Sequence, residues 1–368
     1  MTIKIIEPSS QLEPTPARLQ AAHNLLEECA GIVEGSEVLF VNEVGKGVDP
    51  LVVLFLEDQA RAIGAKVCSI WPSRAESPEA IPENVMTAIE SSPITIFNHQ
   101  IGPLLRLRPA KGLGIRVLNY AATLPVLDSE FARVPNGLWL EVMDRLGARI
   151  NSAKTWSVTC PLGTEISGPM PPPQNNANPT GFSLRSFPMD THSPIPLNSA
   201  SGKIVFKWFV TSSMHDLGTE GITLEAPLTA TITNGRIVSW AGPNHVVEQA
   251  TSFLAEIGTR FGKDPFVVNS WHAGVNPQAC VTFDATQSLE QWMLLAHGNP
   301  RILHFHVVGE KIPGEISATV VDATVMLDGE VVWDRGRLRI FDAEDYRALM
   351  VRWPGSERAF EQAANIGV

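Results

Sequence analysis

The chain has 368 residues, is 44% hydrophobic and carries a formal net charge of −11, so it has apolar material for one large domain or two. It contains no run of about five or six basic residues, which argues against nucleic acid or an anionic membrane as a partner. Its four cysteines are scattered, the start MTIKIIEPSS has no apolar core, and no apolar run approaches about 18 residues, so we expect a cytoplasmic protein with reduced thiols.

Strand patterns and helix patterns alternate in the first third of the chain. Apolar residues at spacings of three and four predict helices at residues 15–34, 49–64 and 83–92. The runs SEVLFVNE, AKVCSIW, PITIFNHQ and GIRVLNYA predict strands. Strands separated by helices imply a parallel sheet that is covered on both faces. No GxGxxG or Walker-type glycine loop follows any of these strands, so the usual nucleotide phosphate loop is not supported.

The second half of the chain has a different pattern. PNGLWLEVMDRLGARINSA (135–153) predicts a long helix, and the Pro- and Asn-rich stretch at 168–181 predicts a loop long enough to be a lid. Strand-like runs such as GKIVFKWFV and RIVSW follow, and Asp-Gly at 328–329 predicts a hairpin. We therefore expect an α/β domain with a parallel sheet at residues 1–134 and a sheet-rich α+β domain at residues 135–368, with the active cleft between them.

Two histidines stand two residues apart in the apolar run RILHFHVVG, residues 301–309. Alternate residues of a strand point to the same face, so His304 and His306 would emerge side by side. Neighbouring imidazoles on one face suit a metal ion or a proton-handling site. The other interpretation is two ordinary histidines, one packed in the core and one facing water.

Three further polar residues stand at strand ends or inside an apolar run. His272 in NSWHAGVNP precedes a tight turn, and His99 follows PITIF at the carboxyl end of a strand, where α/β sheets bind ligands. Asp322 stands in TVVDATV, where a buried carboxylate requires a cation or several donors. The ordinary interpretations are a turn histidine, a histidine at a helix start and an outward-facing aspartate. The sequence contains no GxSxG or HExxH, which argues against a serine hydrolase and a zincin.

Five segments carry a family resemblance. They are GSEVLFVNE with the helix after it, SVTCPLGTEI, PIPLNSASGKIVF, WHAGVNPQA and GEISATVVDATVMLDGEVV, and together they span most of residues 30–340. In this order they resemble the thermophilic-type metallo-aminopeptidases (the aminopeptidase T/S family) and their divergent relatives, the iron-dependent 2,5-dihydroxypyridine 5,6-dioxygenases. VTCPLGTEI and AGVNPQA are the most specific segments. The resemblance implies an aminopeptidase T-like fold and a homodimer.

Only some of the metal ligands of these families have matching residues in this sequence. One family ligand, a carboxylate in the aminopeptidases and a histidine in the dioxygenases, falls on Ser270, and His272 lies two residues further on. The HxD pair that both groups use falls on Val320 and Asp322, so only the aspartate is retained. The aminopeptidases also have a histidine on the strand that resembles RILHFHVVG.

Two more family positions concern catalysis. The glutamate of the aminopeptidase Pro-Gly-Gly-Glu turn is absent, and SFPMDTHSP stands there with Asp190 and His192. The catalytic-base histidine of the dioxygenases follows a strand of the first domain, which is the place of His99 in IFNHQIG.

These observations define an expected site. The expected ligands of one divalent metal, Fe(II) in preference to Zn(II) or Mn(II), are His272, His304, His306 and Asp322. His99 and His192 are expected to be catalytic, and the residues expected to contact a small-molecule substrate are Thr164, Glu165 and Ser270.

We expect a metal-dependent enzyme that acts on a small aromatic or N-heteroaromatic compound. The resemblance implies a ring-opening dioxygenase in which one Fe(II) binds the substrate and O₂ while His99 removes a proton from the substrate. A two-metal aminopeptidase is the alternative, although carboxylates that would hold two cations about 3.5–4 Å apart are missing. A further alternative is a metal-free hydrolase or a non-catalytic binding protein of the same fold. Convergence of the four expected ligands within about 5 Å would separate these possibilities.

Overall fold

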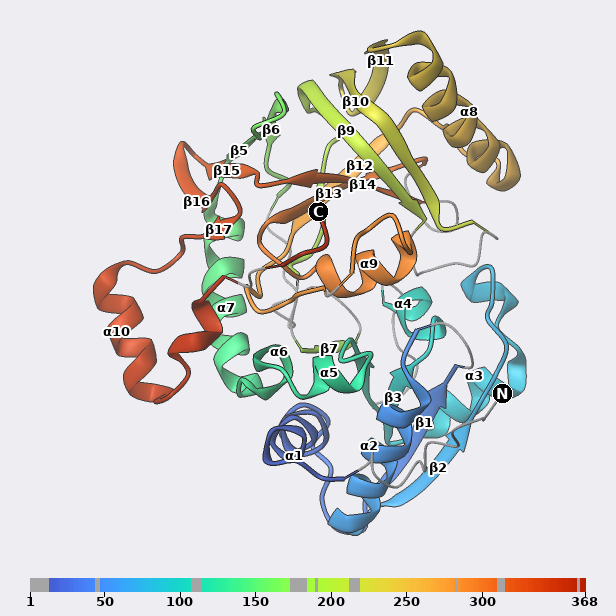
Figure 1. The fold of residues 1–368 in the computed structure, drawn as a ribbon, viewed down its shortest axis with the longest axis vertical. Coiled ribbons are helices and arrows are strands. Elements are labelled where there is room, and N and C mark those ends of the chain that lie inside the picture. Colours follow the sequence, from blue (N-terminus) through green and yellow to red (C-terminus); the bar gives the residue numbers. More distant parts are fainter. Residues whose placement is uncertain are drawn as a thin grey trace, which may run out of the picture.

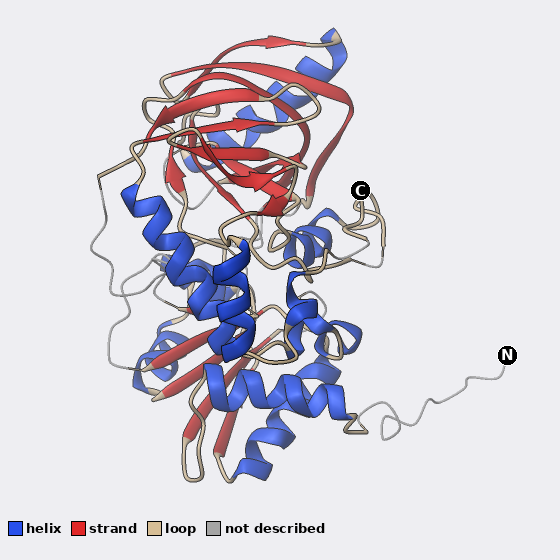
Figure 2. Cartoon of the chain, turned by 90° about the vertical axis from the view of Figure 1, so that its left-hand side faces the viewer, coloured by secondary structure: helices blue, strands red, loops and turns tan. Residues whose placement is uncertain are grey.

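The computed structural model places two sheets at opposite ends of the molecule (Figure 1, Figure 2). It describes residues 13–43, 47–106, 114–172, 184–188, 191–211, 219–281, 283–309, 315–362 and 365–368. The prediction of a parallel sheet followed by a sheet-rich second half is confirmed, and the strands of the second sheet are antiparallel. No helix of the described residues is long and apolar enough to cross a membrane.

Five parallel strands form the first sheet in the described part of the chain. In spatial order they are β2 (Lys66–Ile70), β1 (Glu37–Asn42), β3 (Ile94–Asn98), β4 (Ile115–Asn119) and β7 (Arg185–Phe187). Because β1 pairs with β2 on one side and with β3 on the other, the order in which strands are added reverses between β1 and β3. Open α/β sheets bind ligands outside the carboxyl ends of their strands at such a point.

The first sheet is accompanied by helices that its sequence patterns predict. They are α1 (Pro16–His23) with a π-helical continuation at Asn24–Cys29, α2 (Pro50–Ile63), a 3₁₀ turn at Pro78–Ala80, α3 (Glu83–Ser91), α4 (Ile101–Leu105), α5 (Leu124–Leu127) and α6 (Glu130–Arg133). In α2, the Asp49 side chain accepts a hydrogen bond from the Leu51 N–H at 2.9 Å and caps the first turn. The helix ends at Gly64, whose φ of 97° lies in the left-handed region that favours glycine.

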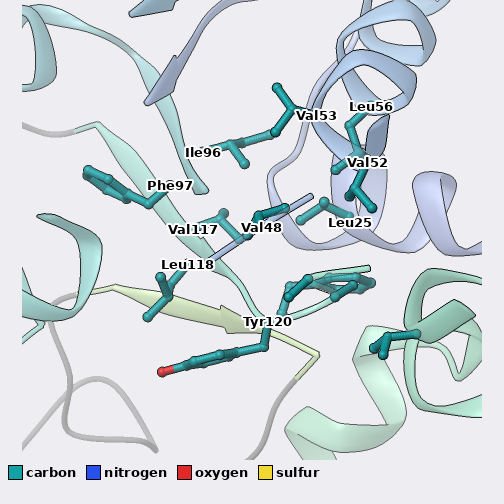
Figure 3. Packing of buried hydrophobic residues seen from close by; sticks show 14 of the residues in the cluster. Leu25, Val48, Val52, Val53, Leu56, Ile96, Phe97, Val117, Leu118 and Tyr120 are labelled. Carbon is teal, nitrogen blue, oxygen red and sulfur yellow. The ribbon is translucent and has the colours of Figure 1, made fainter. Parts of the chain in front are cut away.

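Aliphatic side chains fill the space between the first sheet and its helices (Figure 3). Val52 and Leu56 of α2 are fully buried together with Ile96 of β3 and Val117 of β4. Burial of such a side chain contributes about 1.5–3 kcal/mol to stability. The apolar faces read from the sequence therefore form this core.

Three buried asparagines end the neighbouring strands β1, β3 and β4. Asn119 Nδ2 donates to Asn98 Oδ1, and Asn98 Nδ2 donates to Asn42 Oδ1, both at 2.9 Å. The row of amides ties the carboxyl ends of the three strands together. This row of hydrogen bonds fixes the carboxyl end of β3, which His99 directly follows.

Twelve antiparallel strands form the second sheet in the described residues, at the top of Figure 1. In spatial order they are β17 (Arg337–Leu338), β16 (Glu330–Asp334), β15 (Thr324–Leu327), β5 (Thr155–Thr159), β6 (Glu165–Pro169), β9 (Ser201–Thr211), β14 (Ile316–Val321), β13 (Ile302–Val307), β12 (Val268–Ala273) and β8 (Ile195–Pro196), with β10 (Gly221–Thr233) paired to β9 and to β11 (Arg236–Ala241). The helices of this half are α7 (Asn136–Ser152), α8 (Asn244–Phe261), α9 (Leu289–Ala296), α10 (Ala343–Arg352) and a 3₁₀ turn at Glu357–Phe360.

The organisation of the chain differs from expectation at one loop. The loop predicted at 168–181 begins later than expected, because Gly168 and Pro169 still belong to β6, and residues 173–181 lie outside the described residues. The domain boundary at 134/135 stays a prediction. The chain crosses back after that point, since β7 completes the first sheet.

Candidate metal centre

His272, His304 and His306 come together on one face of the second sheet. β12 and β13 are antiparallel neighbours in which His272 pairs with His304 and Ser270 pairs with His306. Directly opposed residues of neighbouring strands point to the same face. One potential ligand nitrogen of each histidine lies within 4.8 Å of the others, and all three side chains are buried. The two histidines of RILHFHVVG therefore do share a face, and His272 joins them.

The contact between His272 and His304 suits a shared cation. Their Nε2 atoms face each other in close contact, and His272 Nδ1 lies 3.1 Å from the carbonyl oxygen of His192. The carbonyl oxygen accepts a hydrogen bond from the Nδ1–H of His272. The Nε2 atom of His272 therefore carries a lone pair, which points toward His304. His304 Nδ1 is buried without a hydrogen-bond partner in the described structure. In either tautomer of His304, one ring nitrogen therefore lacks a hydrogen-bond partner within the described protein. A bound metal ion would satisfy that nitrogen.

A chain of hydrogen bonds fixes the tautomer of His306. Asn269 Nδ2 donates to Gly309 O at 2.6 Å, which turns its Oδ1 toward Ser270. The single Ser270 hydroxyl proton goes to that oxygen, so Ser270 Oγ accepts from His306 Nδ1 at 2.8 Å. His306 Nε2 is left with a bare lone pair. Histidines that bind metals usually donate their other N–H to an oxygen in this way.

Burial keeps the three imidazoles neutral. It lowers the pKa of His272 and of His304 well below the usual value, and the neighbouring histidines add to the effect. Burial also lowers the pKa of His306, while the Glu315 carboxylate acts in the opposite direction. Neutral imidazole is the form that binds metal ions. The donor set therefore fits a divalent cation without prior deprotonation.

Arg106 brings a positive charge close to this group. It lies at the end of α4, is buried, and donates to Tyr120 Oη at 3.2 Å and Thr191 Oγ1 at 2.8 Å. Thr191 forms a β-bridge with Gly274, two residues after His272. The Arg106 charge lowers the pKa of all three histidines.

Asp322 is not brought to the histidines. It follows β14 with a φ of 54°, and its carboxylate accepts from Arg301 Nε at 2.6 Å and Nη2 at 2.9 Å. Thr319 of β14 faces His304, but the chain turns away after Val321. The expected convergence of four ligands is thus reduced to three, because the turn directs the aspartate to an arginine.

His99 lies at the carboxyl end of β3, as expected, with both ring nitrogens bonded to the main chain. Nδ1 accepts from the Ile101 N–H at 2.9 Å, and Nε2 donates to Pro72 O at 3.0 Å. Burial lowers the pKa of His99, which keeps the ring neutral. Its assignment as a base stays a prediction, and proton uptake would require Nδ1 to release the Ile101 N–H.

A cavity opens where the first sheet predicts a ligand site. His99 and Asn98 line it together with Glu43 after β1, Asn119 of β4 and Glu290 of α9. The cavity has a volume of about 60 Å³, several times the roughly 10–15 Å³ that one water molecule needs. The three clustered histidines are not part of its wall.

His192 holds the site together through its backbone and ring. Its Nδ1 donates to Ser193 O at 2.7 Å, its Nε2 accepts from the Ala273 N–H at 3.2 Å, and its ring packs against Trp271 and Trp333. Its carbonyl oxygen orients His272. A catalytic role for His192 stays a prediction, and Asp190 lies outside the described residues.

The residues expected to contact the substrate have different surroundings. Thr164 is buried, and its Oγ1 accepts from the Val205 N–H at 3.0 Å, which ties the β5–β6 turn to β9. Glu165 is exposed at the start of β6. Ser270, which occupies a family ligand position, here orients His306.

Sequence reasoning missed two neighbours of the group. Glu315 Oε1 lies 3.7 Å from His306 Nε2, and His297 is buried close enough to lower the pKa of His304. The only signal for Glu315 was its position at the start of a strand whose alternate residues face the histidines.

Thr319 supplies a test of the buried polar face. It pairs with His304 in the sheet, and its Oγ1 is buried without a hydrogen-bond partner in the described structure. A buried unsatisfied hydroxyl costs about 1–3 kcal/mol. Thr319→Val should therefore raise the free energy of unfolding of the metal-free protein by about 1 kcal/mol in urea titrations. Thr164→Val is the matched control and should lower it, and a loss of stability in Thr319→Val would contradict this account.

Comparisons with known proteins identify the fold. No family model matches the chain, and no curated protein matches its sequence. Among solved structures, the 2,5-dihydroxypyridine dioxygenase of Pseudomonas putida KT2440 aligns with 89% of this chain and 98% of its own, with a TM-score of 0.60 and 15% identity. Wild-type AmpT of Thermus thermophilus aligns with 90% of this chain and 100% of its own, with a TM-score of 0.50 and 10% identity. The chain therefore has the fold that these two proteins represent, as its sequence segments indicated.

Proposed function

We propose that the protein is a metal-dependent enzyme that acts on a small aromatic or N-heteroaromatic compound and opens its ring with O₂. The observation that carries this proposal is the buried group of His272, His304 and His306, in which Nε2 of His272 and of His306 is left with a lone pair. A ferrous ion held by this group would supply open positions for a substrate oxygen and for O₂. Zn(II) or Mn(II) would also fit three imidazoles.

The chain's own residues would prepare the site. The His192 carbonyl and the Ser270 hydroxyl hold two of the imidazoles in the binding tautomer. Trp271 and Phe305, both fully buried on the opposite face of the sheet, exclude water from behind the strands. His99 lines the cavity at the carboxyl end of the first sheet, whose wall does not include the three histidines. A substrate that extended from the histidine group into this cavity could give its hydroxyl proton to His99 Nδ1 once that nitrogen released the Ile101 N–H.

The fold similarity supports an enzyme without choosing between the two chemistries. An aminopeptidase with two metal ions needs carboxylates to bridge them, and the group of three histidines contains none. A single-ion site is therefore favoured. The family resemblance is the ground for proposing a homodimer, and the scattered cysteines are the ground for proposing a cytoplasmic location.

Oxygen consumption tests the proposal. Protein loaded with Fe(II) under anaerobic conditions is mixed with oxygenated 2,5-dihydroxypyridine, related hydroxypyridines or catechols, while O₂ and the ring absorbance are recorded. The expected result is O₂ uptake in step with loss of the aromatic absorbance for at least one compound. Hydrolysis of dipeptides by the zinc- or manganese-loaded protein, with no O₂ uptake, would favour the aminopeptidase alternative. Absence of both activities would contradict the proposal.

A further inference from the structure

The carboxylate of Glu315 stands opposite the open nitrogen of His306. Its Oε1 lies 3.7 Å from His306 Nε2, and both side chains are buried. The sequence patterns did not mark this glutamate, and the family positions at Ser270, Val320 and Asp322 do not include it.

The sheet register explains why the two groups meet. Ser317 of β14 pairs with His306, and Thr319 pairs with His304. Alternate residues of a strand share a face, so Glu315, which directly precedes β14, belongs on the same face as both histidines. Its place beside His306 thus follows from the pairing of β13 with β14.

The two facing atoms are both hydrogen-bond acceptors. The chain from Gly309 through Asn269 and Ser270 places the His306 proton on Nδ1, which leaves Nε2 with a lone pair. A carboxylate oxygen and an imidazole lone pair repel each other, and burial strengthens that repulsion because the local dielectric is low. A cation between them would turn the repulsion into attraction.

We propose that Glu315 is a fourth protein ligand of the metal ion, beside His272, His304 and His306. The inference rests on the proposed function, because it requires an ion at the three histidines. Ligand atoms at about 2.0–2.2 Å from one ion lie at most about 4.4 Å apart, and Glu315 Oε1 lies within that limit of His306 Nε2, at 3.7 Å. The carboxylate lies outside the group of ligand atoms that are all within 4.8 Å of one another, so it has to move closer to His272 and His304 to share their ion. Binding of the ion would draw the carboxylate inward from the His306 side.

The added carboxylate changes the character of the site. Three neutral imidazoles leave a divalent ion with its full charge, whereas one carboxylate halves the net charge of the site. Three nitrogens and one oxygen suit Fe(II), Mn(II) or Zn(II). The site would still keep open positions for small ligands on Fe(II) or Mn(II).

The test uses Co(II) as a probe on the full-length protein. Wild type, Glu315→Gln and the control Glu248→Gln, which alters an exposed residue of α8, are titrated with Co(II) against a chelator of known affinity. Visible absorption of the bound Co(II) is recorded at the same time, and circular dichroism verifies the fold.

The expected result is at least about tenfold weaker Co(II) binding in Glu315→Gln, with a changed visible spectrum, while Glu248→Gln behaves as wild type. Wild-type affinity and an unchanged spectrum in Glu315→Gln would overturn the role of Glu315 and leave the three-histidine proposal standing. Absence of Co(II) binding by wild type would overturn both.

Discussion

Replacing His304 by alanine is expected to weaken metal binding by about 10²–10³-fold. A site of about four protein ligands binds its ion with roughly 10–16 kcal/mol, so one ligand accounts for about 2.5–4 kcal/mol. The His304 ring lies close to both other members of the group, 4.0 Å from the ring of His272 and 5.1 Å from that of His306, measured between centroids. Competition with a chelator of known affinity measures the loss.

The matched control is His245→Ala, since His245 is an exposed histidine at the start of α8. It should leave metal affinity unchanged. An affinity in His304→Ala within about twofold of wild type would show that the three histidines do not hold the ion. The metal-free form of His304→Ala is expected to fold, because the substitution removes a buried imidazole nitrogen that lacks a partner.

Arg74→Met is expected to lower the free energy of unfolding by about 3 kcal/mol. Arg74 Nε donates to Glu43 and its Nη2 donates to Glu290, each at 2.6 Å, so it links the end of β1 to α9. Burial lowers the pKa of Arg74, but the two carboxylates outweigh it and raise the pKa overall. Removing one member of a buried ion pair costs roughly 3–5 kcal/mol, because the remaining charge stays buried.

Urea titrations of variants test this network. The double variant Arg74→Met/Glu43→Gln should be more stable than Arg74→Met alone, because it also removes the charge of the buried Glu43 carboxylate that has lost Arg74. Lys66→Met, which breaks an exposed pair with Glu37, should change stability by less than about 1 kcal/mol. A similarly small effect of Arg74→Met would show that the link between β1 and α9 does not stabilise the fold.

The parts of the fold that depend on local patterns could be predicted from the sequence. The alternation of strands and helices before residue 120 gives the parallel sheet, and the Asp49 cap and Gly64 mark the two ends of α2. The shared face of His304 and His306 follows from the two-residue repeat of a strand. These features depend only on residues that are close together in the sequence.

The remainder of the site depends on contacts that no local pattern contains. TVVDATV predicts a continuous strand, yet the chain turns at Asp322, which has a positive φ. The Asp322 carboxylate then accepts a hydrogen bond from Arg301. Glu315 meets His306 only through the register of β14 against β13. Ser270 falls on a family ligand position, and only its hydrogen bonds reveal that it orients a ligand instead.

His272, His304 and His306 are proposed to hold one metal ion. The most direct test of this proposal is the metal content of the wild-type protein purified without oxygen, measured by elemental mass spectrometry beside His304→Ala/His306→Ala. The expected result is about one divalent ion per chain, with iron favoured, and its loss in the double variant. Two zinc or manganese ions per chain would indicate the two-metal alternative. Wild-type protein without bound metal, even after anaerobic incubation with Fe(II), Zn(II) or Mn(II), would contradict the claim.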